Sequence, residues 1–129
     1  MRIKLIGLLF LLISIVSCEP LVDHAYFIEV QNSSNASIRC FASFNYPDTA
    51  LSVDKPLLQL ITPHSCTKIE SKDSWDKVLP KDTIEIFFLS EDTLLKYNWN
   101  SIKDQYKILK RLDLSLKDIQ RLNNIVTYQ

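Results

Sequence analysis

Three side chains that could take part in nucleophilic chemistry, His64, Ser65 and Cys66, are consecutive in the sequence. A nucleophilic serine or cysteine needs a base within hydrogen-bond reach and usually a third group that orients this base. His24 and His64 are the only histidines, but neighbouring residues of an extended chain point to opposite sides. His64 also follows a proline, which favours a turn. The pattern therefore favours a polar turn residue, and a small hydrolase that uses His64 is an alternative only.

Glu85 is the second candidate for chemistry because it is centred in the apolar stretch Thr83–Leu89. A glycosidase needs two carboxylates that face each other across a cleft, and no partner for Glu85 stands out in the sequence. An outward-facing position on a half-buried strand explains Glu85 equally well. A zinc site needs three or four ligands at suitable spacing, and the sequence contains no such set. We therefore expect no catalytic residue, no metal and no cofactor.

The tryptophans allow a binding function to be considered. Sites for carbohydrates stack sugar rings on exposed aromatic side chains, and nearby polar groups hold the hydroxyls. Trp75 lies in the polar stretch 71–81, which predicts a loop, so Trp75 is the best candidate for stacking a ligand. The alternative is that Trp75 and Trp99 cover the edges of a small core. We favour core packing and keep a carbohydrate-binding protein as an alternative function.

An Asp-Thr-aliphatic tripeptide occurs three times, at 48–50, 82–84 and 92–94. It resembles the tripeptide that receives O-linked glycans in some Gram-negative anaerobes. The resemblance makes Thr49, Thr83 and Thr93 candidate glycosylation sites, and a bulky glycan belongs on an exposed turn. Asp-Thr is also common at turns and strand starts, so the motif alone leaves both interpretations open.

Cys40 and Cys66 remain when Cys18 is set aside. In an oxidising compartment they could form one disulfide, which would stabilise the fold by about 3–4 kcal/mol. Cys40 lies on the apolar face of its predicted strand, however, where a free cysteine behaves as a small hydrophobic residue. The sequence leaves a Cys40–Cys66 bridge and two free thiols as alternatives.

Cys18 ends a segment with the features of an export signal. Two positive charges, Arg2 and Lys4, precede the apolar run Leu5–Val16, which is shorter than the roughly 20 residues that span a bilayer. The run ends in Ile15–Cys18, which resembles the bacterial lipobox. The resemblance implies that a signal peptide, residues 1–17, is removed and that Cys18 carries fatty acids such as palmitate. Residues 18–24 would then be a lipid-anchored tether and residues 25–129 a single domain.

Composition excludes several classes of protein. Without Arg2 and Lys4 the chain has 13 basic and 15 acidic side chains, which argues against a nucleic-acid-binding protein. The only glycine is Gly7, whereas phosphate-binding loops and nucleophile elbows need glycine where the backbone is strained or approaches a ligand. The turns must therefore use other residues, such as Asn and Asp.

Alternating hydrophobicity predicts most of the elements. A strand at 26–31, a polar loop at 32–35 and a strand at 38–46 have the spacing of a hairpin. Further strands are predicted at 57–61, 66–70, 83–89 and 125–128.

Two short helices are predicted near the C-terminus. Asn98 could cap a helix that carries Trp99, Ile102 and Tyr106, with a strand from Tyr106 onward. Ser115, with Asp118 three residues later, has the spacing of a capping box. The helix that follows would direct Leu116, Ile119 and Leu122 inward and end at 123–124. The sequence thus predicts a mainly β (α+β) domain, a small antiparallel sheet or sandwich with two short C-terminal helices.

Four segments are similar to those of a group of small uncharacterised cell-envelope lipoproteins common in gut-dwelling Gram-negative anaerobes. These segments are 45–49, 82–88, 99–102 and 108–123, which together extend over most of the domain. They contain strand edges, caps and aromatic residues rather than reactive groups. The resemblance therefore implies a location in the cell envelope and no particular activity.

From these features we expect a membrane-anchored envelope lipoprotein with a non-enzymatic binding or structural role. Its lipid at Cys18 would hold it to a membrane, the outer membrane in our prediction, facing either the periplasm or the cell surface. Its other partners would be envelope proteins or glycans, and we expect no nucleic acid among them. The carbohydrate-binding lipoprotein and the small hydrolase are the alternatives.

Overall fold

The computed structural model describes residues 26–47 and 50–129 of the chain. The predicted signal peptide, the lipid attachment site Cys18, the tether with His24, and Thr49 lie outside the described residues.

One sheet contains three strands in the order β4-β1-β7. The central strand β1 (Tyr26–Asn32) pairs antiparallel with β4 (Cys66–Ser71) and parallel with β7 (Ile125–Tyr128). Ile28 and Val30 of β1 are fully buried while their neighbours are more exposed, as expected for a strand with one face toward a core. The other face of this sheet is mostly polar.

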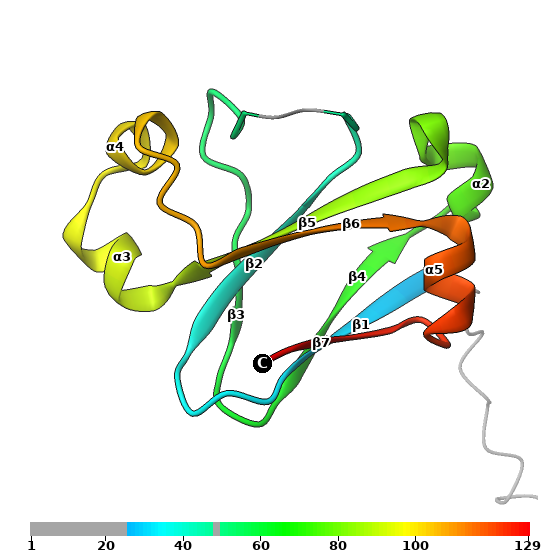
Figure 1. Cartoon of the computed structure of the whole chain (residues 1–129), viewed down its shortest axis with the longest axis horizontal. Coiled ribbons are helices and arrows are strands. Elements are labelled where there is room, and N and C mark those ends of the chain that lie inside the picture. Colours follow the sequence, from blue (N-terminus) through cyan, green and yellow to red (C-terminus); the bar gives the residue numbers. More distant parts are fainter. Residues whose placement is uncertain (1–25, 48–49) are drawn as a thin grey trace, which may run out of the picture.

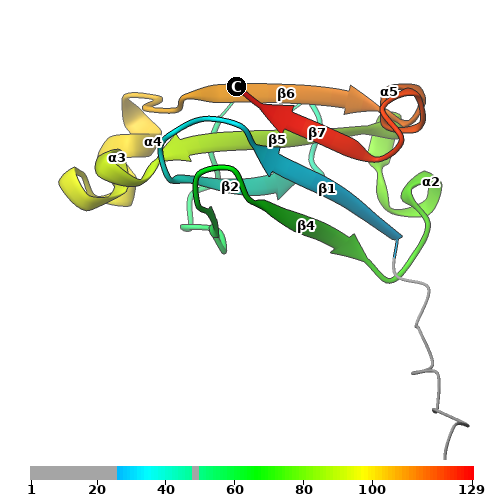
Figure 2. The ribbon, with the colours of Figure 1, turned by 90° about the horizontal axis from the view of Figure 1, so that it is seen from below.

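The second sheet contains four strands in the order β3-β2-β5-β6, all antiparallel. These strands are β2 (Ile38–Ser43), β3 (Gln59–Ile61), β5 (Thr83–Ser90) and β6 (Lys110–Ser115). The two sheets lie face to face, as Figures 1 and 2 show. The prediction of a mainly β sandwich is therefore confirmed: the described residues form seven strands and several short helices.

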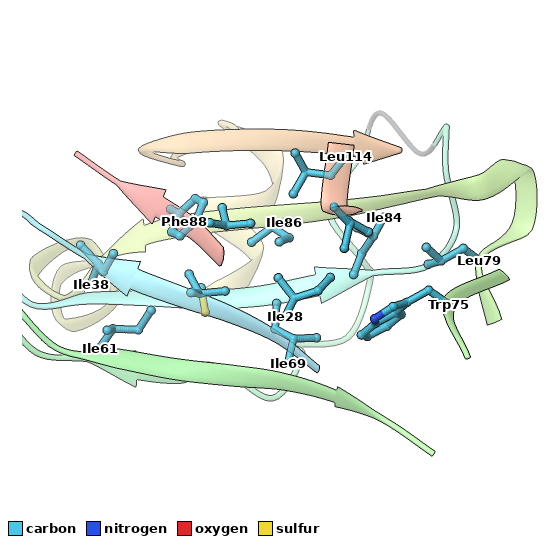
Figure 3. Packing of buried hydrophobic residues seen from close by; sticks show 14 residues of the cluster. Ile28, Ile38, Ile61, Ile69, Trp75, Leu79, Ile84, Ile86, Phe88 and Leu114 are labelled. Atoms are coloured by element: carbon cyan, nitrogen blue, oxygen red, sulfur yellow. The ribbon is translucent and has the colours of Figure 1, made fainter. Parts of the chain in front are cut away.

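The core lies between the two sheets. Figure 3 shows β1 and β4 contributing Ile28 and Ile69, and β5 contributing Ile84, Ile86 and Phe88. Burying an aliphatic or aromatic side chain of this size contributes roughly 1.5–3 kcal/mol. Burial of these side chains thus supplies most of the free energy that holds the two sheets together.

A second hydrophobic cluster covers the opposite face of the four-stranded sheet. Phe41 and Phe87 stack there with ring centroids 4.9 Å apart, and Leu51, Leu89 and Ile102 pack in the same cluster. The cover consists of the segment 50–58 and two helices, α3 (Glu91–Lys96) and α4 (Trp99–Asp104). Because both faces of β5 are covered, its sequence is apolar at nearly every position.

The predicted hairpin of the first two strands is wrong. The strands themselves form, but β1 and β2 belong to different sheets and do not pair with each other. The loop between them crosses from one sheet to the other, and Asn32 at its start is 1% exposed. The length of the loop limits the distance between the two strands, but it does not determine in which sheet the second strand pairs.

Both predicted C-terminal helices are present. Asn98 caps α4, and its side chain accepts a hydrogen bond of 2.8 Å from the backbone N–H of Ser101. Ser115 and Asp118 form the predicted capping box of α5 (Leu116–Arg121). The strand predicted from Tyr106 onward instead begins at Lys110. The helices α3 and α2 (Trp75–Val78) were not predicted. The 3-10 turn η1 (Pro80–Asp82) follows α2.

Candidate functional site

Exposed leucines gather around an ion pair between β2 and α3. They line a hollow of about 350 Å³, which we call the leucine groove, formed by Arg39, Lys55, Pro56, Leu57, Leu58, Glu91, Leu94 and Leu95. Leu57 is 88% exposed and Leu95 is 79% exposed. Leu58 and Leu94 are half-buried and pack against the second hydrophobic cluster. Single exposed leucines are common on proteins, but leucines that line a hollow together are typical of interaction sites.

The Arg39–Glu91 pair holds the elements of the groove together. The Arg39 guanidinium donates to both carboxylate oxygens of Glu91, from Nε at 2.7 Å and from Nη2 at 3.1 Å. Its Nη1 lies 3.4 Å from the carbonyl oxygen of Leu58. Two-pronged pairs of this kind have a defined geometry, so Arg39 joins β2 to the start of α3 and to the segment before β3.

The leucine groove contains one ion pair, Arg39–Glu91, and a second cation, Lys55. The hydrogen bond from Arg39 holds the pKa of Glu91 below its usual value, and the positive charge of Lys55 adds to this effect. The groove thus offers aliphatic surface around the Arg39–Glu91 pair and the Lys55 ammonium. Such a surface can bind a protein segment by burying apolar area, and the residues that line it include no histidine, serine or cysteine.

Glu85 lies on the outer face of the four-stranded sheet, as predicted, but it is not exposed to solvent there. Glu85 is 0% exposed, because the outer face of the four-stranded sheet is covered rather than open to solvent. Arg111 Nη2 donates to Glu85 Oε1 at 2.5 Å, and Arg111 also donates to Asp113, from Nε at 2.7 Å. In the sheet register Asp113 is directly opposite Glu85.

This buried network is better suited to structure than to catalysis. Hydrogen bonding to Asp113 raises the pKa of Arg111 above its already high value, and hydrogen bonding to Tyr106 and the charge of Glu85 act in the same direction. The permanently charged Arg111 thus bridges both carboxylates, and its guanidinium lies 5.6 Å from the Phe87 ring centroid. A substrate would have to displace this packing to reach Glu85.

His64 lies in the predicted turn, where it is exposed and has a φ of 55°. Its Nε2 lies 3.0 Å from Asn35 Oδ1. The Ser65 hydroxyl instead donates to the carbonyl oxygen of Thr62 at 2.7 Å. His64, Ser65 and Cys66 do line one hollow of about 380 Å³, but the hydrogen bonds direct the imidazole and the hydroxyl to different partners.

The ligand-stacking role predicted for Trp75 does not fit its position. Trp75 lies on α2 rather than in a loop and is only 7% exposed. Its ring stacks on Phe44 at a centroid distance of 6.4 Å, and Figure 3 shows it pointing into the core beside Leu79. The alternative interpretation, that Trp75 closes one end of the core, agrees with the structure.

Two of the three candidate glycosylation sites lie within the described residues. Thr83 opens β5 and is half-buried, and its hydroxyl donates to the carbonyl oxygen of Lys81 at 3.1 Å. Thr93 lies in α3 and is also half-buried. Glycosylation at Thr49, Thr83 or Thr93 stays a prediction.

Both cysteines of the described domain are free, so the disulfide alternative does not form in this structure. Cys40 is fully buried on the core face of β2, whereas Cys66 is exposed at the start of β4 in the other sheet. A disulfide needs both side chains within about 4 Å of each other at Cβ and directed toward one another. Because Cys40 is buried in the core and Cys66 is exposed on the other sheet, the two side chains are not placed to form a disulfide.

Thiol alkylation will distinguish the two cysteines. Burial raises the pKa of the Cys40 thiol to about 11, and only the thiolate reacts. We expect iodoacetamide at neutral pH to modify Cys66 alone in the folded protein, and both cysteines after unfolding. Mass spectrometry of the alkylated peptides measures this. Equal modification of Cys40 in the folded state, or no modification of Cys66, would contradict the arrangement.

Within residues 26–47 and 50–129, no helix is long and apolar enough to cross a membrane. The same residues contain no group of three or more His, Cys, Asp or Glu side chains placed to hold a metal ion.

Comparison with protein-family models, with curated proteins and with solved structures finds no significant match to this chain.

Proposed function

We propose that this protein is a lipid-anchored lipoprotein of a bacterial cell envelope, with a non-enzymatic role in binding another envelope protein. The observation that carries the proposal is the Ile15–Cys18 tetrapeptide at the end of a short apolar segment with a positive start. The first described strand begins only eight residues after Cys18, at Tyr26. A folded domain that directly follows a short tether is the expected layout of such a lipoprotein.

The leucine groove supports a protein partner over a glycan. A glycan-binding site would need exposed aromatic rings, and its best candidate, Trp75, is buried in the core. The groove presents Leu57 and Leu95 instead, at 88% and 79% exposure. Aliphatic side chains gain free energy mainly by excluding water, which another protein's apolar surface provides and sugar hydroxyls do not.

The positions of Glu85 and His64 favour a binding role over the hydrolase alternative. Glu85 is enclosed and compensated by Arg111. His64 contacts Asn35 rather than a serine or cysteine. A hydrolase would need an accessible base beside a nucleophile or a second carboxylate.

The lipid anchor can be tested by the mass and N-terminus of the protein purified from its host. We expect the wild-type chain to begin at Cys18 and to be heavier than its residues by two or three acyl chains, because each buried CH₂ contributes only about 0.8 kcal/mol and one chain does not anchor stably. Cys18→Ala should abolish the added mass. Ser17→Ala, which keeps a small residue before Cys18, is the matched control and should retain it. A wild-type chain that begins elsewhere or carries no lipid would refute the anchor.

The binding role can be tested by photo-crosslinking from the leucine groove in intact cells. A crosslinking amino acid at Leu57 or Leu95 should give one discrete adduct, whereas the same amino acid at Leu109, exposed on β6's side of the sheet, should not. Leu95→Asp should reduce the Leu57 adduct roughly tenfold, as for a residue near the centre of an interface. Leu95 is so exposed that this substitution should change stability by less than about 0.5 kcal/mol. Equal crosslinking from Leu109 would contradict the proposed site.

A further inference from the structure

We infer that the end of the three-stranded sheet where β1 begins rests on the membrane that carries the lipid. This inference rests on the proposed anchor at Cys18. The surface concerned, which we call the anchor end, consists of Tyr26 and Phe27 on β1 and of Leu122 and Ile125 at the start of β7. The occupant we assign to it is the bilayer surface itself.

The first argument is the length of chain between the lipid and the fold. Seven residues separate Cys18 from Tyr26, and a fully extended chain covers about 3.3–3.6 Å per residue, so the eight steps place the Cα atom of Tyr26 at most about 29 Å from that of the lipidated Cys18. That reach is close to the length of β1 itself, which at about 3.3 Å per residue is roughly 23 Å. The start of β1 is therefore held near the membrane, whatever the orientation of the rest.

The second argument is what this end of the molecule exposes. Tyr26 is 46% and Phe27 38% exposed, although Ile28, the next residue, is fully buried. Phe27 lies on the outer face of the sheet, where Lys68 Nζ is 4.3 Å from its ring centroid. An aromatic ring beside the ammonium of a long lysine side chain is the combination found at membrane–water interfaces.

Two aliphatic side chains extend the same surface. Ile125 is 41% exposed and lies beside Glu29 in the parallel pairing of β1 with β7. Leu122 is 39% exposed at the end of α5, and its carbonyl oxygen accepts a hydrogen bond from Ile125 N–H. Tyr26 and Phe27 thus open β1, and Leu122 and Ile125 lie at the junction of α5 and β7, beside the middle of β1 and at the same end of the sandwich (Figures 1 and 2).

The charges predict how the contact is made. The outer face of this sheet carries Glu29, Glu70 and Lys68, so it has no positive excess that would require anionic lipids. The attraction between this surface and the bilayer would therefore come from apolar and aromatic side chains. The contact should therefore form on neutral zwitterionic bilayers and persist at high salt.

The arrangement leaves the leucine groove free for a partner. Figures 1 and 2 show the start of β1 and α5 at one end of the sandwich, and α3 and α4 at the other. With the anchor end on the bilayer, α3 and its exposed Leu95 point away from the lipid.

The test is depth-dependent quenching of a fluorophore on the full, lipidated protein in phosphatidylcholine vesicles. A Cys66→Ser background removes the exposed native thiol, and Cys40 is buried. Single cysteines replace Phe27 or Ile125 at the anchor end, and Leu57 or Leu95 in the leucine groove as matched controls. Each is labelled with an environment-sensitive dye, and brominated lipid serves as the quencher.

We expect brominated lipid to lower emission roughly twofold at positions 27 and 125 and to leave positions 57 and 95 unchanged, since interfacial groups lie about 5–10 Å into the headgroup boundary. High salt should not change this pattern. A membrane-bound protein with unquenched dye at 27 and 125, or with quenching at 57 and 95, would overturn the inference and leave the anchor intact. A protein that carries no lipid by mass would refute the proposed function separately.

Discussion

Replacing Arg111 with alanine should destabilise the folded protein by about 3–5 kcal/mol, the usual cost of removing one partner of a buried ion pair. Glu85 is fully buried and Arg111 Nη2 donates to its carboxylate. Without Arg111 the carboxylate would stay in the core with its main counter-charge removed. Urea denaturation followed by tryptophan fluorescence measures the change in the free energy of unfolding.

Two further variants make this prediction specific. Asp113 is the more exposed partner of Arg111, with a side chain 40% exposed, so Asp113→Asn should cost no more than about 1 kcal/mol. Replacing Glu85 and Arg111 together with Gln and Met should recover much of the loss, because no isolated charge is then buried. An Arg111→Ala variant as stable as Asp113→Asn would show that the network contributes nothing to the fold.

Replacing Asn32 with alanine should destabilise the protein by about 2–3 kcal/mol, since each buried polar group left without a partner costs about 1–3 kcal/mol. Asn32 Nδ2 donates to the carbonyl oxygens of Ala36 at 2.8 Å and Ile61 at 3.1 Å. Its Oδ1 accepts from Ser34 N–H at 3.0 Å. The Asn32 side chain thus connects the loop between the two sheets to the end of β3.

Asn35 provides the matched control for this prediction. It is an exposed asparagine in the same loop and contacts only the side chain of His64 among the hydrogen bonds described. Asn35→Ala should change the free energy of unfolding by less than about 0.5 kcal/mol. Thermal unfolding of the two variants side by side measures the difference. A similar loss for both would mean that the loop, and not the Asn32 amide, determines the crossing.

The features that local sequence controls could be predicted. Alternation located β1 and β2, a continuous run of β-favouring residues located β5, and the capping residues Asn98 and Ser115 located α4 and α5. These signals act within a few residues of the chain. The short helix α2 gave no such signal, because four residues contain no helical period, and its Trp75 was therefore assigned to a loop.

The features that depend on distant pairing could not be predicted. The hairpin was wrong because the choice of sheet depends on contacts of Asn32 with Ile61, far along the chain. The buried position of Glu85 depends on its pairing with β6. Arg111 and Asp113 of that strand lie on the same face of the sheet as Glu85. The leucine groove likewise joins residues of three separate segments. Nothing in any one segment indicates the other two.

The parallel pairing of β1 with β7 has a consequence for biosynthesis. It places Ile125 beside Glu29, so the three-stranded sheet is incomplete until the residues of β7 have left the ribosome. Contacts between such distant positions form slowly, because a long loop must close first. The export that we propose for this chain would benefit from this delay, because a polypeptide threaded across a membrane has to be extended, and β1 cannot complete its sheet before β7 is available.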